Sequence, residues 1–483
     1  MSPAMIDFPR NPRPANTGVS VVIGEGGQQL PLITHATIAD AFLAQTEDFK
    51  AVYDIDGRPT AQWVGTRWEV SKDTAPLREA VGRYVQGLYE LYPEADGKID
   101  PRRKLLDSGF VAGVMQFVAA RLPKTKFEVF DRNPYLLGLP GCNVVDLRTG
   151  EIRTMLRTDY ITQRLYVSPA DTPTPRFDRF LSEITCGDVD LAEYLLRLAA
   201  LTLTAEASQK LFFLWGSGRN GKGVFIRLLT AILGKDNGGF AVTLNPDQIT
   251  VAKMSTDTMK RVYSSLEGKR LAAVEEATKG NLNHAMLKQM SGGDALSGAR
   301  MRQDARTFKP THKLLLSTNE RPQLPADDAF RGRVHFIPFK ASFVGREDAT
   351  LEATLHNAEL GGIVRRLIQL APDVLLNGLR PPAVVVDETE QLFDELDDVK
   401  QFIEERLVVD TSGAVRRADM QDAVRGWLTE LSGATGVVVS DGGSDIRLLA
   451  KLKVRFPERR LSKARDAKRS YAYHGCRLSD MAE

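Results

Sequence analysis

A glycine-rich stretch near the middle of the chain has the residue types and spacing of a phosphate-binding loop. Residues 211–229 read LFFLWGSGRNGKGVFIRLL, which predicts a buried strand, a turn and an amphipathic helix in that order. The turn fits the pattern G-x-x-x-x-G-K, in which backbone N–H groups surround a polyphosphate and Lys222 reaches the β- and γ-phosphates. A chance glycine-rich turn before a helix is the alternative interpretation. The predicted nucleotide-binding residues are Gly216, Ser217, Gly218, Arg219, Asn220, Gly221, Lys222, Gly223 and Val224.

Two adjacent glutamates follow a second apolar run. The residue after Lys222 is Gly223, so the loop offers no hydroxyl ligand for Mg²⁺, and carboxylates elsewhere must contribute. Residues 270–280 read RLAAVEEATKG, a predicted buried strand with Glu275 and Glu276 at its carboxyl end, where ligand sites of open α/β sheets lie. One carboxylate can hold Mg²⁺, for which we choose Glu275, while the other polarises the attacking water. A glutamate pair on a solvated loop is the alternative.

Three more polar residues complete the predicted hydrolytic set. The strand KLLLSTN, 313–319, ends in Asn319, whose amide can contact both the γ-phosphate and the attacking water. The alternative is an asparagine in a turn before Arg321-Pro322. Arg331 and Arg333 in DDAFRGRVHFIPF, 327–339, are too far past Asn319 to be assigned to their own pocket. In ring-shaped ATPases such arginines enter the neighbouring site and stabilise transition-state charge, and the sequence leaves open which of the two does so.

Basic residues gather in two regions that could bind nucleic acid. Residues 296–302 and 306–309 suit two arms of a hairpin, which could follow a phosphate backbone without reading base sequence. Ile446–Arg477 contains eleven Lys or Arg against two acidic residues. The alternatives are a solvated charged hairpin and a basic tail that binds protein or RNA. The predicted DNA contacts are Arg300, Arg302, Arg306, Lys309, Arg447, Lys451, Lys453, Arg455, Lys463, Arg465, Lys468 and Arg469.

The elements that position these residues predict an α/β fold. Strand–helix repeats from 211 to about 339 favour a parallel sheet flanked by helices. Before them we expect an α+β region without a catalytic constellation, built from a hairpin (51–70), helices (76–92 and 105–122) and short strands (127–153), then a helical collar (177–208). After them we expect a helical segment (348–379), three helices (392–407, 417–431 and 446–454) and two strands around a basic turn (460–478), a winged-helix pattern.

Length and composition agree with a multidomain protein. The 483 residues carry a net charge of only +2, so total charge does not indicate a partner. Three separated cysteines predict plain thiols in a reducing cytoplasm, and we expect neither a signal peptide nor a membrane span. The predicted domain boundaries are 1–160 for the lead-in region, 161–209 for the collar, 210–340 for the ATPase core, 341–387 for the lid and linker, and 388–483 for the winged helix.

Five motifs then resemble those of one family, in that family's order. GSGRNGKG, AAVEEA, LKQMSGGDALSGARMRQD, FKPTHKLLLSTNERP and DDAFRGRVHFIPF resemble superfamily 3 helicases of the phage and plasmid primase-helicase type, which are related to poxvirus and satellite-phage enzymes. The resemblance implies an AAA+-like core that uses ATP and Mg²⁺, with Asn319 as sensor and Arg331 or Arg333 acting in trans. It also implies a hexameric ring on single-stranded DNA. The roughly 130 residues before the match are too few for a primase domain, so we expect a separate primase partner.

These features predict an ATP-dependent DNA helicase that acts on single-stranded and forked DNA during phage, prophage or plasmid replication in a bacterial cytoplasm. The main alternative is a replication initiator whose ATPase is a switch, with sequence-specific duplex binding by 388–483 and little unwinding. A small-molecule kinase would need an acceptor pocket and would not respond to DNA. A scaffold protein would not explain the glutamate pair together with Asn319.

Overall fold

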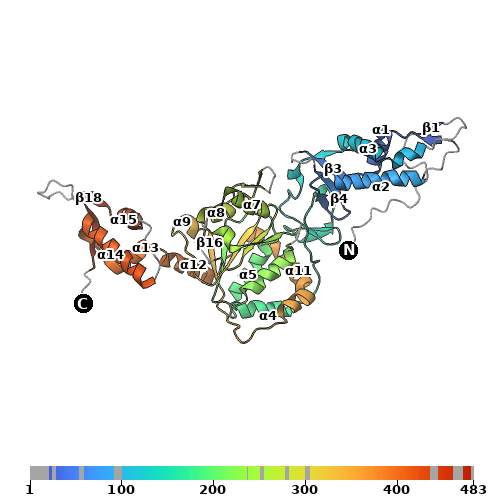
Figure 1. Cartoon of the computed structure of the whole chain (residues 1–483). Coiled ribbons are helices and arrows are strands. Elements are labelled where there is room, and N and C mark those ends of the chain that lie inside the picture. The colour runs from blue at the N-terminus through green and yellow to red at the C-terminus, as the bar shows by residue number, and fades with distance from the viewer. Residues whose placement is uncertain are drawn as a thin grey trace. The chain divides into compact units, whose positions relative to one another are not determined.

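A computed structural model gives the fold of the chain (Figure 1). It describes residues 21–23, 29–53, 59–91, 101–235, 238–250, 255–277, 282–299, 305–435, 444–460 and 471–479. The chain forms two compact units. The first contains Met1–Glu320 and Pro338–Pro382, and the second contains Arg321–Ile337 and Ala383–Glu483.

The first unit begins with an α+β region, as predicted. A strand pair, β1 (Val21–Ile23) and β2 (Gln29–Pro31), precedes helix α1 (His35–Gln45). Helices α1, α2 (Ala75–Leu91) and α3 (Ser108–Arg121) share an apolar core that includes Val85 and Val118, both fully buried. Next to them lies a sheet of order β5-β4-β3-β6. Its strands are β3 (Phe49–Val52), β4 (Thr60–Trp63), β5 (Trp68–Val70) and β6 (Lys124–Thr125).

The short strands predicted for 127–153 form an antiparallel meander. Its strands are β7 (Leu136–Leu139), β8 (Asn143–Asp146) and β9 (Glu151–Thr154). The two predicted turns contain Gly141 at φ 74° and Gly150 at φ 76°, a left-handed conformation that glycine adopts without strain. A short 3₁₀ helix, η3 (Phe127–Val129), precedes the meander, and another, η4 (Arg157–Asp159), follows it.

The parallel sheet predicted for the core is confirmed. Its strands β11 (Ala241–Leu244), β12 (Leu271–Val274), β15 (Lys313–Thr318) and β10 (Leu211–Trp215) are neighbours in that order and run in the same direction. Val274 pairs with Leu316, and Trp215 pairs with Thr318, so the carboxyl ends of three strands meet at one edge. The helices that connect or follow these strands are α6 (Lys222–Leu233), α7 (Thr256–Leu266) and α8 (His284–Met290).

The predicted helical collar is present, but it consists of two helices. Helix α4 (Pro175–Ile184) and helix α5 (Val189–Leu201) are separated by a turn in which Cys186 and Gly187 have φ of 55° and 83°. Positive φ values cannot continue an α-helix, and the side chain of Asp188 caps α5 by accepting the N–H of Leu191 at 2.9 Å. The prediction was therefore wrong in treating 177–208 as continuously helical.

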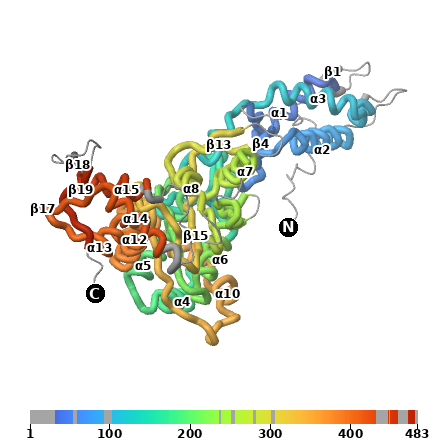
Figure 2. Tube along the Cα trace, turned by 60° about the vertical axis from the view of Figure 1, so that its left-hand side comes forward, coloured from blue at the N-terminus to red at the C-terminus, as the bar shows by residue number. Residues whose placement is uncertain are grey.

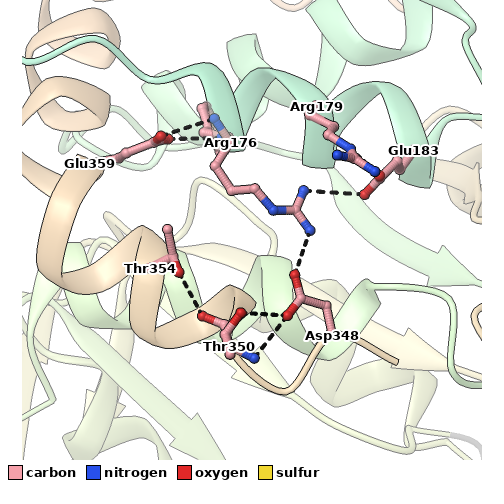
Figure 3. A network of polar contacts seen from close by, with 8 residues as sticks. Arg176, Arg179, Glu183, Asp348, Thr350, Thr354 and Glu359 are labelled. Atoms are coloured by element: carbon pink, nitrogen blue, oxygen red, sulfur yellow. Dashed lines mark hydrogen bonds and ion pairs between the residues drawn. The ribbon is translucent and has the colours of Figure 1, made fainter. Parts of the chain in front are cut away.

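A long segment of the first unit, residues 339–359, returns from the sheet to α4 (Figure 3). It includes α10 (Leu351–Thr354) and a π-helix, η6 (Leu355–Glu359), and it leads into α11 (Leu360–Asn377), which lies beside α5 (Figure 1). Glu359 is only 5% exposed, and its carboxylate accepts the N–H groups of Arg176 (2.9 Å) and Phe177 (2.8 Å). This carboxylate satisfies two donors at the N-terminus of α4 that no intrahelical carbonyl can reach.

The second unit contains α9 (Asp328–Arg331), β16 (Val334–Pro338) and a C-terminal module whose core includes Phe402, Trp427 and Leu452. The module follows α12 (Ala383–Glu395) and has a three-stranded sheet of order β17-β19-β18. Its other elements are α13 (Asp398–Arg406), β17 (Leu407–Arg416), α14 (Arg417–Thr435), α15 (Ser444–Arg455), β18 (Glu458–Arg460) and β19 (Tyr471–Leu478).

Two expectations for this module need correction. The predicted helix 392–407 is interrupted, because Asp397 accepts the N–H groups of Val399 and Lys400 and begins α13 as a new helix. Strand β17 was not predicted, since its register with β19 joins residues about sixty positions apart. The antiparallel pairing of β18 with β19 is confirmed, while the basic turn between them lies outside the described residues.

The Glu359 cap gives a prediction about stability. We expect Glu359→Ala to lower the free energy of unfolding by about 2–3 kcal/mol, because two buried N–H groups lose their acceptor. Glu359→Gln keeps one acceptor oxygen and should cost about 1 kcal/mol. The shift of the urea midpoint measures both effects, with Glu128→Ala, on an exposed glutamate, as control. Equal midpoints for Glu359→Ala and the control would contradict the assigned role.

Candidate functional site

The glycine-rich loop, Gly216–Gly221, joins β10 to α6 in a tightly curled conformation. Gly218 and Gly221 have φ of 94° and 89°, and Arg219 between them has φ of 44°. A Cβ atom on Gly216 would lie 2.3 Å from the carbonyl oxygen of Phe339, and one on Gly221 would lie 2.4 Å from Cγ2 of Ile184. These glycines are therefore required by left-handed backbone and by close neighbours, and α4 supports the loop through Ile184.

The segment 339–359 holds the loop from another side. The Asn220 amide donates to the carbonyl of Phe339 at 3.1 Å, and the N–H of Phe343 donates to the carbonyl of Arg219 at 2.9 Å. An ion pair of 3.1 Å joins Arg219 to Glu347. The same segment bonds to α4 through Arg176 and Asp348 at 3.0 Å (Figure 3). The loop, α4 and the segment are therefore joined by direct contacts. The pKa of Asp348 is lowered to about 2, first by its hydrogen bond from Thr350 and then by the Arg176 guanidinium.

Lys222 is the central cation of the site. It is 4% exposed, and its Nζ donates to the carbonyl of Gly216 at 2.6 Å and to Oδ1 of Asn319 at 3.1 Å. Burial lowers the pKa of its ammonium to about 8, because neither neutral acceptor replaces the lost hydration of a full charge. A desolvated cation that has no ion-pair partner in the described part of the chain, next to a curled run of glycines, fits a polyphosphate.

The predicted carboxylates lie at the same edge of the sheet as this cation. Glu275 and Glu276 directly follow β12, and Asn319 directly follows the neighbouring strand β15. Glu276 has a left-handed backbone with φ of 58°, which is uncommon for a residue with a side chain and marks a sharply turned strand end. Both glutamates are exposed residues.

The donor set suits Mg²⁺ in a nucleotide site and does not form a closed metal cage. Among the described residues, no cluster of three or more His, Cys, Asp or Glu is arranged to hold a metal ion. Mg²⁺ commonly uses one or two carboxylates, with waters and substrate phosphates as its other ligands. Glu275 fits this smaller requirement, and it stays our predicted metal ligand.

Arg227 is a residue of the site that was not predicted. It forms a two-point ion pair with Glu352, with distances of 2.9 and 2.5 Å, and its pKa is raised mainly by that hydrogen bond, with Glu275 adding a smaller electrostatic effect. A Cβ atom on Gly223 would lie only 2.8 Å from Nη1 of Arg227. Gly223, where a hydroxyl residue was expected, therefore leaves room for Arg227. The i, i+4 spacing of the two residues on one predicted helix could have indicated this.

Arg331 and Arg333 both belong to the second unit, and their surroundings differ. The Arg331 guanidinium lies 3.7 Å from Oδ1 of Asp394 and 5.4 Å from the ring centre of Phe393. Nη1 of Arg333 is buried, and it has no hydrogen-bond partner in the part of the chain that the structure describes. A buried donor without an acceptor is unfavourable, so Arg333 has unused capacity to bind an anion.

The predicted DNA-binding residues are described only in part. Strands β13 (Leu296–Gly298) and β14 (Arg306–Phe308) pair as the two arms of the expected hairpin, which lies beside α7 (Figure 2). The Arg306 guanidinium stacks 4.0 Å from the ring centre of Phe127 and pairs with Glu267 at 3.3 Å, while Lys309 is exposed. In α15, Lys451 pairs with Asp398 at 2.7 Å. Lys453 and Arg455 are exposed, and Arg447 lies in the same helix. The positions outside the described residues are Arg300, Arg302, Lys463, Arg465, Lys468 and Arg469.

Other sequence expectations can also be checked here. The three cysteines are free, with Cys476 buried and Cys186 exposed, as predicted. In the described part of the chain, every helix is too short or too polar to cross a bilayer. The predicted domain boundaries and the roles of the site residues stay predictions.

Comparisons with known proteins support the family that the motifs suggested. Residues 39–186 match the family model described as D5 N terminal like, and residues 214–333 match a family of unknown function, DUF5906. These two matches support a relationship to the D5-like primase-helicases of phages and viruses. They favour a helicase- or replication-related role.

Individual relatives come from large DNA viruses. A candidate helicase of Acanthamoeba polyphaga mimivirus is 25% identical over 325 residues, which are 62% of this chain and 33% of that protein. A candidate helicase of Invertebrate iridescent virus 3 is 29% identical over 231 residues, 46% of this chain and 24% of that protein. A candidate helicase of Frog virus 3 is 28% identical, covering 54% and 29%. The chain thus spans a third or less of the length of these relatives.

The fold also has a counterpart among solved structures. The apo structure of the NrS-1 C-terminal region, residues 305–718, aligns with a TM-score of 0.51 at 11% identity. The alignment covers 92% of this chain and 99% of that one. At this identity the similarity concerns the fold alone, a mixed α/β chain with a parallel sheet and flanking helices.

The buried ammonium predicts a pH-dependent stability. Its pKa is lower in the folded chain, about 8, than in the unfolded chain, about 10.5, so the unfolded state binds the proton more tightly. The buried charge therefore lowers the free energy of unfolding by its full amount below pH 8, and this destabilisation diminishes as the pH rises toward 10. Lys222→Met should therefore stabilise the protein by about 1–2 kcal/mol at pH 7, and this gain should shrink by pH 10.

Urea unfolding at pH 7 and pH 10 measures this difference. Lys235→Met, which removes an exposed lysine just after α6, is the matched control and should show no such dependence. A Lys222→Met protein that is less stable than wild type at pH 7 would contradict the desolvated state of the ammonium.

Proposed function

We propose that the chain is an ATP-dependent DNA helicase with an AAA+-type, superfamily 3 core. The observation that carries the proposal is the placement of Lys222, held 3.1 Å from Asn319 at the sheet edge where Glu275 and Glu276 also lie. This arrangement joins a polyphosphate grip to two carboxylates and a polar sensor, the set that hydrolysis of a γ-phosphate requires. The match to the D5 N terminal like model and the relatives named as helicases support the same proposal.

Each residue has a separate task in this mechanism. The glycine-rich loop donates backbone N–H groups to the phosphates, and Lys222 exchanges its neutral acceptors for phosphate oxygens. Glu275 would hold Mg²⁺, which would supply positive charge to neutralise the phosphates. Glu276 accepts the proton of the attacking water and orients it, and Asn319 hydrogen-bonds the same water. Because Asn319 already contacts Lys222, its amide can report whether a phosphate lies between them.

Arg333 is our choice for the residue that acts on a neighbouring subunit. Its Nη1 is buried without an acceptor among the described residues, whereas Arg331 is paired with Asp394 and stacked on Phe393. Within the described residues Arg333 has no ion pair to break when it binds a phosphate. Its full binding energy is then available to stabilise the transition state. This role requires an oligomer, and we propose a hexameric ring.

Movement along DNA would use the β13–β14 hairpin. Arg306, which pairs with Gly298 at the end of the ladder nearest the turn, is held by Phe127 and Glu267. Lys309 and the predicted Arg300 and Arg302 are therefore the candidates for phosphate contact. A hairpin of this kind tracks a backbone without reading bases. We propose single-stranded and forked DNA as substrates, with priming supplied by another protein.

The C-terminal module supports a second candidate, an initiator with an ATP switch. Its element order, α13-β17-α14-α15-β18-β19 with sheet order β17-β19-β18, supports the proposal of a winged helix, and α15 presents exposed Lys453 and Arg455. Such a module can bind duplex DNA. Strand separation distinguishes the candidates, because the helicase separates a forked duplex with ATP and the switch does not.

The hydrolytic roles predict a specific pair of defects. Lys222→Ala should lose nucleotide binding, whereas Glu276→Gln should still bind ATP and hydrolyse it about 100- to 1,000-fold more slowly, because only the proton acceptor is lost. Phosphate release with and without oligo(dT) measures turnover, and a fluorescent ATP analogue measures binding. Glu128→Gln is the control. Wild-type turnover in either variant would disprove the assignment.

The trans role of Arg333 can be tested by mixing variants. Arg333→Ala and Lys222→Ala should each hydrolyse ATP at below about one hundredth of the wild-type rate. Mixed together they should recover part of it, because some interfaces combine an intact Lys222 with an intact Arg333 from the neighbour. Arg331→Ala should keep most turnover. No recovery on mixing, or a larger defect in Arg331→Ala, would argue against the choice of Arg333.

A further inference from the structure

A polar cleft lies in the first unit, outside the nucleotide site, in a region where the sequence indicated no functional constellation. It has a volume of about 570 Å³, within the range of small-ligand sites. It is formed by η3, η4, the β7–β8–β9 meander and the residues between them. Three arginines line it, together with Asn133 and Tyr160. They are Arg132, Arg148 and Arg153.

Two of the arginines are fixed in place by carboxylates of the same wall. Arg148 binds Asp146 through Nε (3.0 Å) and Nη2 (2.5 Å), and its guanidinium lies 5.0 Å from the ring centre of Tyr135. The Arg148 hydrogen bond lowers the pKa of Asp146. Arg153 binds Asp159 through two bonds of 2.7 Å. Burial alone would raise the pKa of Asp159, but the Arg153 hydrogen bond and the Leu156 N–H outweigh it and lower that pKa. Arg153 also donates from Nη1 to the carbonyl of Thr154 at 3.1 Å. Of the five N–H donors of each guanidinium, Arg148 uses two and Arg153 three in these bonds, so both keep donors for an anion.

The third arginine is held differently. Arg132 follows Asp131, which has φ of 51°. The carboxylate of Asp131 accepts the N–H of Thr162 at 2.9 Å, so the side chain of Asp131 points into the interior. Arg132 is exposed at the cleft, and it has no ion-pair or hydrogen-bond partner within the described residues. With two carboxylates and three guanidinium groups, the lining carries an excess of one positive charge, and Arg132 supplies it.

The position of the cleft indicates what occupies it. Val129, which lines the cleft, ends η3, and Phe127 at the start of η3 carries the stacked guanidinium of Arg306 from the β13–β14 hairpin. The cleft is thus adjacent to Arg306, at the turn end of the β13–β14 ladder, in the element proposed to follow DNA. Arginine donors beside an aromatic residue suit a phosphodiester and its base, and they suit any base sequence.

We propose that this cleft, Arg132 foremost, is a second binding site for single-stranded DNA, which holds a backbone phosphate of the strand that passes the hairpin. The inference rests on the proposed function, because it takes the hairpin as the element that tracks DNA. The cleft is built differently from the nucleotide site, since its anion-binding groups are side chains and the glycine-rich loop offers backbone N–H groups.

Fluorescence anisotropy of a labelled 20-nucleotide oligo(dT) with the full chain tests the site. Arg132→Glu should weaken binding about tenfold and reduce the slope of log affinity against log salt by about one. Arg132→Lys should stay within about twofold of wild type, because the charge is kept. The matched control is Arg78→Glu, on an exposed arginine of α2, which should also stay within twofold. Equal binding by Arg132→Glu and Arg78→Glu would overturn the proposal.

A crosslinking experiment locates the strand independently of any loss of folding. Thr158 is an exposed residue of the cleft, and Thr158→Cys can be alkylated with azidophenacyl bromide, whose bromide leaves as the thiolate attacks. After illumination it should crosslink to oligo(dT) above the level of the equally treated parent protein, whose native thiols give the background. No increase over the parent would overturn the site. A second outcome would also overturn it: dTMP binding that is lost in Arg132→Glu while oligo(dT) binding is kept. The cleft would then hold a free mononucleotide and not the strand.

ATP hydrolysis by the same wild-type preparation separates this proposal from the proposed function. A protein that binds oligo(dT) through Arg132 without hydrolysing ATP would retain the cleft and refute the motor. A protein that hydrolyses ATP and binds oligo(dT) equally well with Arg132→Glu would retain the motor and refute the cleft.

Discussion

The structure depends on one desolvated positive charge. Among the described residues, Lys222 has two neutral oxygens as its hydrogen-bond partners, from Gly216 and Asn319. Burial of a cation in this state costs free energy, and the proposed polyphosphate ligand would lower that cost. The contact between Lys222 and Asn319 connects the start of α6 to the end of β15. The proposed phosphate-binding lysine and the proposed sensor are therefore already adjacent without a ligand.

Long-range contacts keep this loop in its conformation. Ile184 of α4 lies against Gly221, the segment 339–359 bonds to Asn220 and Arg219, and Glu359 fastens that segment to the N-terminus of α4. The network in Figure 3 is thus the mechanical support of the nucleotide site, although none of its residues needs to touch a nucleotide. Arg227, paired with Glu352 near Glu275, extends the same support to the carboxylates.

Local pattern was sufficient for the parts of the site that one strand, turn or helix determines. The glycine spacing around Lys222 and the apolar runs before Glu275 and Asn319 each specify a short element, and parallel strands necessarily end at one edge. What the sequence could not give were pairs set by tertiary packing. Glu359 caps a helix more than 180 residues earlier, β17 pairs with a distant strand, and Arg227 occupies space that Gly223 leaves. The arginines of the cleft were overlooked for the same reason, since their spacing follows a meander whose register only the fold reveals.

The most direct test of the account is the pKa of the Lys222 ammonium, measured by NMR on protein with isotope-labelled lysine, with the signal assigned by its absence in Lys222→Met. The account predicts a pKa of about 8 without nucleotide and a rise to above about 10 when a non-hydrolysable ATP analogue binds, because phosphate oxygens then stabilise the charge. A pKa near that of a solvated lysine, unchanged by the analogue, would contradict it.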